Sequence, residues 1–382
     1  MEKIMFLDYE TMRVIWWLLL GALLIGFAVM DGFDMGVGAL LRWIGRTDTE
    51  RRIVINTVGP VWEGNQVWLI LGAGAIFAAF PPLYAVSFSG FYVAMFLALL
   101  ALILRPVGFK YRSKLLDPRW RSTWDWTLVI GGVVPPLIFG VALGNVMLGV
   151  PFRFDHELRM FYEGTFFGLL TPFPLLCGLV SLSMLIMHGG TFLALKTGGR
   201  VQARARQAGS VAAVVMLALF SLAGLWVAFG VDGYVIAAGA GHDAPSNPLA
   251  KSVMRETGAW LNNYGAHWWL WLVPLIVYVS AIKTIVFLRW GREMWAWIAS
   301  AFSVAGVIGT FGVGTFPFLL PSAIDPRSSL TVWDSTSSHM TLFLMFLAVL
   351  IFLPIVIAYT SWVYHVMRGK VTEKFVKGDS AY

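Results

Sequence analysis

The sequence predicts an all-α polytopic membrane protein. Of its 382 residues, 58% are hydrophobic and 13% are charged, whereas soluble globular proteins average about 45–50% apolar and about 25% charged residues. Apolar stretches recur along the whole chain, and about 20 such residues are enough for one helix to cross a bilayer. Because a helix satisfies its own backbone hydrogen bonds in lipid, this pattern favours a bundle of membrane-spanning helices.

Nine apolar segments are candidates for these helices, and we expect them to form a single membrane domain over residues 1–382. The second segment is the weakest, because Pro60, Glu63, Asn65 and Gln66 interrupt its first half. The nine segments are residues 14–41, 54–79, 82–104, 124–149, 165–195, 207–230, 268–288, 294–320 and 340–366.

Charge alternates between the loops that join these segments. Twenty Lys and Arg residues follow the first, third, fifth and seventh segments or lie in the C-terminal tail, and seven lie on the other side. The positive-inside rule makes the basic side cytoplasmic. We therefore expect an external N-terminus and a cytoplasmic C-terminus. Residues 231–267 form an external loop, which Pro245 and Pro248 keep from being helical throughout.

Several other classes of protein are excluded. The net charge of +7 does not indicate a nucleic-acid partner, because the basic residues lie in short loops between apolar segments. Cys177 is the single cysteine and cannot form an internal disulfide. His188 is the one histidine in the interior of a predicted segment, because His339 and His365 lie at the two ends of the ninth, so no pair at matched depth exists to bind haem, and no Cys or His cluster would hold a metal. We expect this chain alone to bind no cofactor and no metal.

Two acidic residues within apolar segments are the strongest functional signal. Asp34 lies in the first segment and Glu63 in the second, at similar depth from the expected cytoplasmic side. A carboxylate in a bilayer costs on the order of 2.5–3.5 kcal/mol on insertion scales, and its commonest use is to take up protons or ions. Asp31 lies three residues before Asp34 and should share its helix face. Gly32 and Gly36 would let another helix approach closely there.

Polar residues around Glu63 strengthen this signal. Asn65 and Gln66 could form hydrogen bonds with Glu63 or with water, and a polar cluster of this kind rarely faces lipid. Pro60 lacks an amide hydrogen and should free a carbonyl group one turn back, which opens a place for water.

Structural interpretations of the same residues remain open. The carboxylates of Asp31 and Asp34 could cap or pair at a tight helix crossing, and Glu63 could form a salt bridge with an arginine. Arg105, which ends the third segment, could pair with Asp34 or Glu63, or it could be an ordinary positive-inside anchor, as residue counts favour. Asp125, which starts the fourth segment, is expected at the membrane interface.

Two further functions are compatible with these residues. Membrane carboxylates beside broken helices also occur in ion-coupled secondary transporters, although we find no paired halves with matching interruptions. A chain without haem ligands could also be a purely structural partner of a haem-bearing subunit.

Six motifs together resemble subunit II of cytochrome bd ubiquinol oxidase, and the similarity runs from about Tyr9 to Tyr382. The motifs are Asp31–Gly38 (DGFDMGVG), Glu50–Arg52 (ERR), Trp62–Trp68 (WEGNQVW), Ser89–Tyr92 (SGFY), Arg105–Phe109 (RPVGF) and Trp333–Ser338 (WDSTSS).

This resemblance implies a complex in the bacterial inner membrane that oxidises quinol, reduces O₂ to water and builds a membrane potential without a pump. It implies a subunit I partner that holds two b-type haems, one d-type haem and the quinol site. Small single-span accessory subunits and a structural quinone also occur in relatives. For the fold, it implies one four-helix bundle over residues 14–149, a second over 165–320, and an additional ninth helix at 340–366.

The resemblance also suggests roles for individual residues. Glu63 matches an acidic position on the proton path toward the haems, where some members have Asp. Asp34 matches an acidic position thought to support proton delivery or a haem environment, and Arg105 matches a basic position beside it. We hypothesise that Glu63, helped by Asp34, Asp31, Asn65 and Gln66, relays cytoplasmic protons into subunit I, because carboxyl groups surrounded by apolar surface can accept and release protons near neutral pH.

Overall fold

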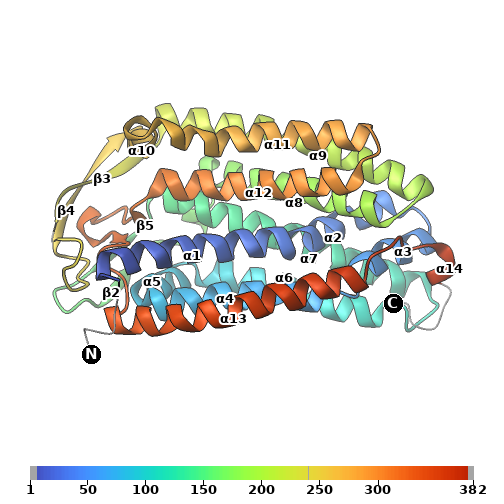
Figure 1. Cartoon of the computed structure of the whole chain (residues 1–382), viewed down its shortest axis with the longest axis horizontal. Helices are drawn as coiled ribbons and strands as arrows, with labels where there is room; N and C mark the ends of the chain where they lie inside the picture. The colour runs from blue at the N-terminus through green and yellow to red at the C-terminus, as the bar shows by residue number, and fades with distance from the viewer. Residues whose placement is uncertain (1–6, 240, 377–382) are drawn as a thin grey trace.

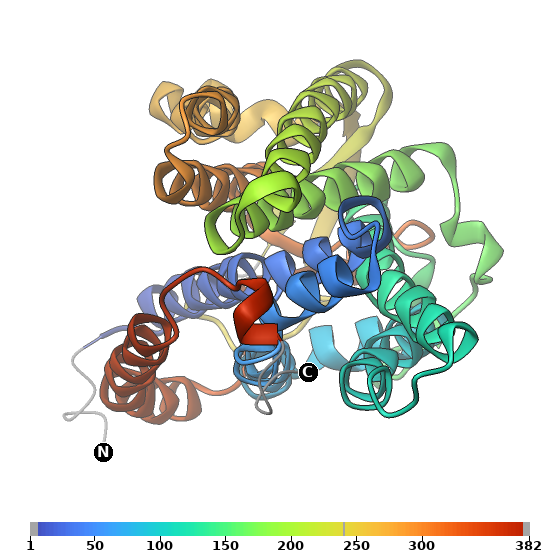
Figure 2. The same cartoon turned by 90° about the vertical axis from the view of Figure 1, so that its right-hand side faces the viewer.

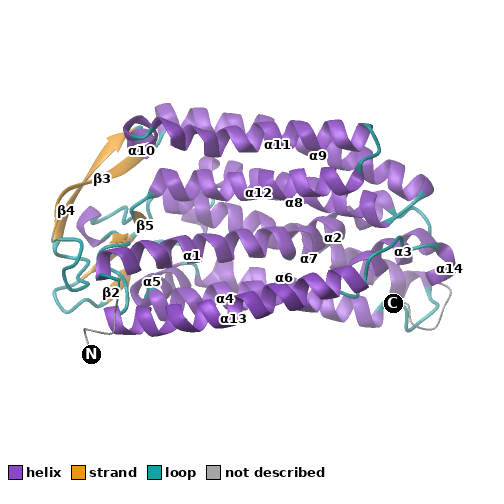
Figure 3. Ribbon diagram, viewed as in Figure 1, coloured by secondary structure: helices purple, strands orange, loops and turns teal. Residues whose placement is uncertain are grey.

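The chain forms long helices that run side by side and are joined at two opposite ends (Figure 1). The structure is a computed structural model that describes residues 7–239 and 241–376. One end carries the β-strands, which are orange in Figure 3, and we call it the strand end. The other carries α3 (Asp48–Val58) and α14 (Glu373–Val376), and we call it the basic end because arginine-rich loops lie there.

Eight helical stretches in the described part of the chain are long and apolar enough to cross a membrane. This confirms the predicted class, an all-helical polytopic membrane protein. These stretches are α1 (Tyr9–Met30) with α2 (Gly32–Ile44), α6 (Tyr92–Tyr111), α7 (Pro118–Leu148), α8 (Pro172–Lys196), α9 (Gly199–Gly230), α11 (Leu272–Arg289) with the 3-10 turn η4 (Trp268–Trp271), α12 (Glu293–Thr315) and α13 (His339–Val366).

The second predicted segment, 54–79, is wrong at its start. Residues 54–58 belong to α3, and the chain turns at 59–61 before α4 (Trp62–Ala79) begins. Pro60 lies in this turn, where its missing amide hydrogen costs no helical hydrogen bond. The 18 residues of α4 run alongside the other helices (Figure 1). Its polar first turn keeps α4 outside the group of eight apolar stretches.

The third predicted segment, 82–104, is wrong at its C-terminal end. The chain forms α5 (Pro81–Gly90), bends at Phe91 and continues as α6 to Tyr111. Arg105 therefore lies inside a helix instead of ending it. The positive charge does not stop the helix because a buried carboxylate, described below, pairs with it.

Several other boundaries also differ from the prediction, and α1 and α7 begin earlier than expected, at Tyr9 and Pro118. Helix α8 begins at Pro172, seven residues after the predicted start of its segment, and only the short 3-10 turn η2 (Phe167–Leu169) lies in between. Helix α9 begins at Gly199 instead of 207, because a helix can continue beyond its apolar part into basic residues. Helix α12 ends at Thr315 instead of 320, and β5 (Phe318–Leu320) follows it.

The centre of the molecule is a close crossing of α2 with α8. A methyl group on Gly36 would lie 2.0 Å from the carbonyl oxygen of Leu185 and 3.0 Å from the Cα atom of Gly189. The two backbones are therefore in contact, as the small residues of the first segment predict. Helix α2 also packs against α7, and α1 packs against α4, α12 and α13.

Among the residues described, three two-stranded antiparallel sheets cover the strand end. The predicted external loop, 231–267, contains one of them and is not helical throughout, as its prolines predict. The sheets are β1 (Phe152–Phe154) with β2 (Met160–Tyr162), β3 (Asp232–Gly239) with β4 (Lys251–Thr257), and β5 with β6 (Leu330–Thr331); the short turns η3 (Ala259–Leu261), α10 (Asn262–Ala266) and η5 (Pro326–Ser328) complete this end.

Helix α13 lies at the edge of the molecule, where it contacts α1 and α4. The chain then crosses the basic end, and α14 packs against α3, as the view onto this end shows (Figure 2). The backbone amide of Val371 donates to the carbonyl group of Lys196, which fastens this last segment to the end of α8.

Candidate functional site: a buried charge cluster beside an exposed carboxylate

Arg105 and Asp31 form the core of a buried charge cluster. Two guanidinium nitrogens of Arg105 donate to the two carboxylate oxygens of Asp31 over 3.0 and 2.8 Å. Asp31 is fully buried and Arg105 is 2% exposed. A fork-like pair of hydrogen bonds fixes the orientation of both groups as well as their separation. From the sequence, Asp34 and Glu63 were the possible partners of Arg105. In the structure, both hydrogen bonds of the guanidinium go to Asp31 instead.

Asp34 lies beside this pair. Its Oδ2 atom is 3.8 Å from the Arg105 guanidinium and accepts a hydrogen bond of 2.8 Å from the side-chain amide of Asn65. Its Oδ1 atom is buried and has no hydrogen-bond partner within the part of the chain that the structure describes. Two carboxylates therefore share one guanidinium, and with both ionised the three groups carry a net negative charge. A bound proton would neutralise that charge.

The amide of Asn65 extends the cluster to the edge of the protein. Its Oδ1 atom accepts a hydrogen bond of 2.8 Å from the phenol of Tyr364 on α13. The chain of contacts therefore runs from Tyr364 through Asn65 to Asp34 and Arg105. The sequence does not single out Tyr364, because a tyrosine near the end of an apolar segment is typical of an interfacial anchor.

Local backbone features place these side chains. Asp31 lies at the junction where α1 ends and α2 begins, and it shares one face with Asp34, as predicted; both carboxylates approach Arg105 from that face. Gly131 on α7 makes room for the arginine, since a methyl group there would lie 2.7 Å from Cγ of Arg105. The buried arginine thus depends on a missing side chain on the neighbouring helix.

Glu63 lies apart from this cluster. It belongs to the first turn of α4, as Asn65 does, but its side chain is on the exposed surface of the chain, whereas Asn65 is buried. Glu63 makes no hydrogen bond or ion pair with any described residue, and Gln66, one turn from Glu63, is half-buried. The expected bonds from Asn65 and Gln66 to Glu63 are therefore absent in the described part of the chain, and Asn65 serves Asp34 instead.

The outer face of α4 is otherwise apolar. Val67, Ile70 and Leu71 are 46%, 69% and 42% exposed. Glu63 is thus a carboxylate on an apolar surface, and this surface extends along α4 toward the strand end. Between the buried cluster and the basic end lies a hydrophobic core that contains Phe33, Val37, Leu41, Val54, Val58 and Phe109.

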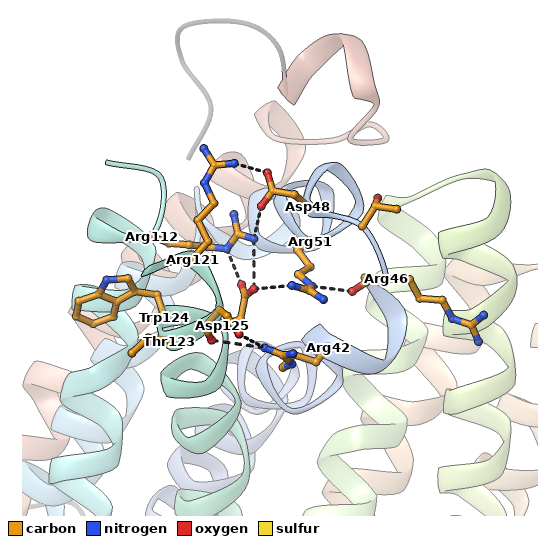
Figure 4. A network of polar contacts seen from close by, with 12 residues as sticks. Arg42, Arg46, Asp48, Arg51, Arg112, Arg121, Thr123, Trp124 and Asp125 are labelled. Atoms are coloured by element: carbon orange, nitrogen blue, oxygen red, sulfur yellow. Dashed lines mark hydrogen bonds and ion pairs between the residues drawn. The ribbon is translucent and has the colours of Figure 1, made fainter. Parts of the chain in front are cut away.

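A second ionic network lies at the basic end (Figure 4). The carboxylate of Asp125 is fully buried and pairs with Arg112 and Arg51, and Asp48 binds Arg112 and Arg121. The expected position of Asp125 at the membrane interface stays a prediction, and the structure adds that its carboxylate is buried within this network. This network joins α3, α6 and α7 and is built from the loops that the sequence identifies as basic.

His188 is fully buried on α8 and contacts two neighbouring helices. Its Nδ1 atom lies 2.7 Å from the Ser300 hydroxyl, and Nε2 lies 3.0 Å from the carbonyl oxygen of Val29. Both ring nitrogens are therefore engaged. It is the one histidine away from the ends of the described membrane helices, and within the described residues no group of three or more His, Cys, Asp or Glu side chains could hold a metal ion.

Known proteins with similar sequences share nearly the whole length of this chain. Cytochrome bd-I ubiquinol oxidase subunit 2 of Escherichia coli (strain K12) is 51% identical over 371 residues, which cover 97% of this chain and 98% of that protein. Cytochrome bd ubiquinol oxidase subunit 2 of Bacillus subtilis (strain 168) is 31% identical over 365 residues, which cover 95% of this chain and 98% of the relative.

A solved structure and a family model agree with these relatives. A chain in the structure of bd oxidase from Geobacillus thermodenitrificans superimposes with a TM-score of 0.71 over 93% of this chain and 98% of that one, and at 18% identity it shows a shared fold. The family described as cytochrome bd terminal oxidase subunit II matches residues 12–367. The chain therefore belongs to the cytochrome bd terminal oxidase subunit II family.

Proposed function

We propose that this chain is subunit II of a cytochrome bd-type quinol oxidase in the bacterial inner membrane, and that it helps deliver cytoplasmic protons for the reduction of O₂ to water. Relatives that carry the name of this subunit match 95–97% of the chain, and its apolar helices suit a multi-pass membrane protein. Family membership favours this function over an ion-coupled secondary transporter. The haems supply the redox chemistry, and subunit I holds the two b-type haems and the d-type haem.

The proposed topology has nine membrane crossings. Helix α4 is the second crossing, although its polar first turn lowers its hydropathy, and α5 with α6 is the third. The N-terminus lies in the periplasm and the basic end faces the cytoplasm, which the excess of Lys and Arg there supports. The crossings before α8 form one four-helix bundle, α8, α9, α11 and α12 form the second, and α13 is the ninth helix. A small single-span subunit, lipid and a structural quinone are further proposed partners.

The observation that carries the proposed role is the two-sided character of α4. Glu63 extends from one face onto the exposed apolar surface, while Asn65 extends from the other to Asp34. A charged group on an apolar membrane surface is costly unless a partner covers it, and subunit I is the partner that the family implies. Glu63 would then lie in the contact between the subunits, where a carboxyl group can pass protons toward the haem site.

The buried cluster plays a supporting part in this proposal. The Asp31–Arg105 pair is held in one geometry, because two hydrogen bonds join the groups and their opposite charges cancel. Asp34 is the member with an oxygen atom that has no partner in the described chain, so it is the group that can bind a proton or a water molecule. A hydrophobic core separates it from the basic end, so we place the entry of protons at Glu63 instead of along α2.

The test is the substitution Glu63→Gln in the intact complex with subunit I. Quinol-driven O₂ consumption should fall roughly tenfold or more, because a positioned proton carrier contributes about 10²–10⁴-fold to a rate. The haem content in reduced-minus-oxidised spectra should stay unchanged, since Glu63 forms no hydrogen bond or ion pair with a described residue. Glu157→Gln is the matched control, because Glu157 is an exposed carboxylate at the strand end and its loss should leave the rate unaltered.

Two results would contradict this function. Full activity and normal proton uptake in Glu63→Gln would remove Glu63 from the path. The alternative role, structural support for subunit I, would be favoured if Glu63→Gln and Asp34→Asn together left the rate intact while deletion of the chain abolished haem insertion. Asp34→Asn must be accompanied by haem spectra, because it can act through haem retention as well as through proton transfer.

A further inference from the structure

The phenol of Tyr364 is the outermost member of the contact chain that ends at Asp34. It donates to Asn65 Oδ1 over 2.8 Å, and Asn65 in turn donates to Asp34 Oδ2 over 2.8 Å. Asn65 is 2% exposed, so water does not replace either partner freely. Tyr364 comes from α13, which is distant in sequence from every other member of the cluster.

We propose that Tyr364 is a positioning residue, which holds the Asn65 amide in the orientation that donates to Asp34. This inference rests on the proposed role of Asp34 in proton delivery and deepens it. The side-chain amide of asparagine has one accepting and one donating end, and a rotation of its plane exchanges them. A carboxylate can only accept, so the donating end must face Asp34 when that group is ionised. A phenol that donates to the opposite end favours this orientation.

The groups around Asp34 come from several helices, and each affects the charge that it carries. Arg105 on α6 and Asp31 at the junction of α1 and α2 are its charged neighbours. His188 on α8 meets the ring of Phe33, the residue before Asp34, edge-on with ring centroids 6.0 Å apart. Asn65 is the neutral donor among these neighbours. Tyr364 adds no charge, so its effect passes through Asn65.

The consequence is a dependence of activity on pH. A hydrogen bond to a carboxylate favours its ionised form, and loss of that bond favours the protonated form. If activity requires a proton on the cluster, Tyr364→Phe should move the alkaline limb of the pH profile of quinol oxidation to higher pH. One neutral hydrogen bond supports a shift of about half a pH unit.

Tyr359→Phe is the matched control. Tyr359 lies on the same helix, but its side chain is 63% exposed. The control changes the same chemical group at the membrane-facing surface and should leave the pH profile superimposable on that of the unaltered complex. The measurement uses subunit II assembled with subunit I, with haem content recorded for each variant.

A double substitution separates action through Asn65 from action elsewhere. Asn65→Leu should shift the profile in the same direction, and adding Tyr364→Phe should shift it no further, because the two residues act in series. Where Asn65→Leu fails to assemble, Asp34→Asn takes its place. In that background Tyr364→Phe should have no effect on the profile.

Three results would overturn the inference. They are an unshifted pH profile in Tyr364→Phe, an equal shift in Tyr359→Phe, or a shift by Tyr364→Phe that persists unchanged when Asn65→Leu, or Asp34→Asn in its place, is also present. A failure of the proposed function is recognised separately: Asp34→Asn would then have the pH profile of the unaltered complex. A profile that responds to Asp34→Asn but not to Tyr364→Phe overturns this inference alone.

Discussion

Arg105 and Asp31 are joined by two parallel hydrogen bonds of 3.0 and 2.8 Å in the interior of the protein, although 74 positions separate them in the sequence. The pair connects α6 to the junction of α1 and α2, and Asp34 lies at 3.8 Å from the same guanidinium group. An arginine in this position has to balance two carboxylates. The stability of the region therefore depends on charge balance as well as on geometry.

The first prediction concerns that balance. Arg105→Gln leaves two carboxylates without a cation and should cost about 3–5 kcal/mol, as for other buried pairs that lose one partner. Asp31→Asn leaves Arg105 with Asp34 and should cost less. Thermal unfolding of the purified complex, followed by the loss of haem absorbance, measures both. An equal or larger loss in Asp31→Asn would show that charge balance does not control stability here.

The second prediction concerns the crossing of α2 and α8. Gly36→Ala places a methyl group 2.0 Å from the Leu185 carbonyl oxygen, so the helices must separate, and we expect a loss of about 2–4 kcal/mol, comparable to other severe packing defects. Gly21→Ala on α1 is the control, because a methyl group there meets no atom within 4 Å. It should be neutral or stabilising by up to about 1 kcal/mol, since alanine favours helices. Equal melting temperatures for the two variants would contradict the close contact.

The third prediction concerns His188, which links α8 to Ser300 on α12 and to the Val29 carbonyl group on α1. His188→Leu removes both contacts and leaves a polar group without its partner, so it should cost about 1–3 kcal/mol. His188→Gln keeps a donor and an acceptor and should recover most of that loss. Thr284→Val serves as the control, because the hydroxyl of Thr284 is buried but bonds only within its own helix. Identical stability of the leucine and glutamine variants would argue that only ring volume matters.

The fourth prediction concerns pH at the basic end. Burial raises the pKa of Glu50, but hydrogen bonds from Arg204 and from the backbone amides of Arg46 and Thr47 lower it more, so it lies below the usual 4.5. A lowered carboxyl pKa stabilises the folded state above the unfolded pKa, and the benefit disappears as pH falls through the folded value. The difference in melting temperature between the unaltered complex and Glu50→Gln should therefore be constant above about pH 5 and shrink on acidification. A difference that grows at low pH would contradict this sign.

The sequence predicts most of the helices because their signal is local. Apolar length identifies the spans, and the spacing of Asp31 and Asp34 correctly places both on one face. Helix boundaries are less predictable, because hydropathy shows where the apolar residues end and not where the helix ends. Arg105 shows the difference. As a basic residue at the end of an apolar run it resembles a loop anchor, and only a carboxylate from a distant segment reveals that it is buried.

The separation of Glu63 from Asn65 was accessible from the sequence. Residues two positions apart on a helix do not face each other, so one polar cluster on α4 was never compatible with helical geometry. Helix periodicity does not say which of the two faces points inward. Tyr364 could not be found by spacing at all, because its contact with Asn65 joins α4 to the far end of the chain.

The place of Tyr364 on α13 also bears on the order of biosynthesis. Every other member of the charge cluster lies within the first third of the polypeptide and emerges from the ribosome early. The cluster stays unfinished until α13 has been translated and inserted beside α4. A nascent chain therefore carries a partly built acidic centre through most of its time at the translocon, and premature termination before α13 would remove a member of that centre along with the helix.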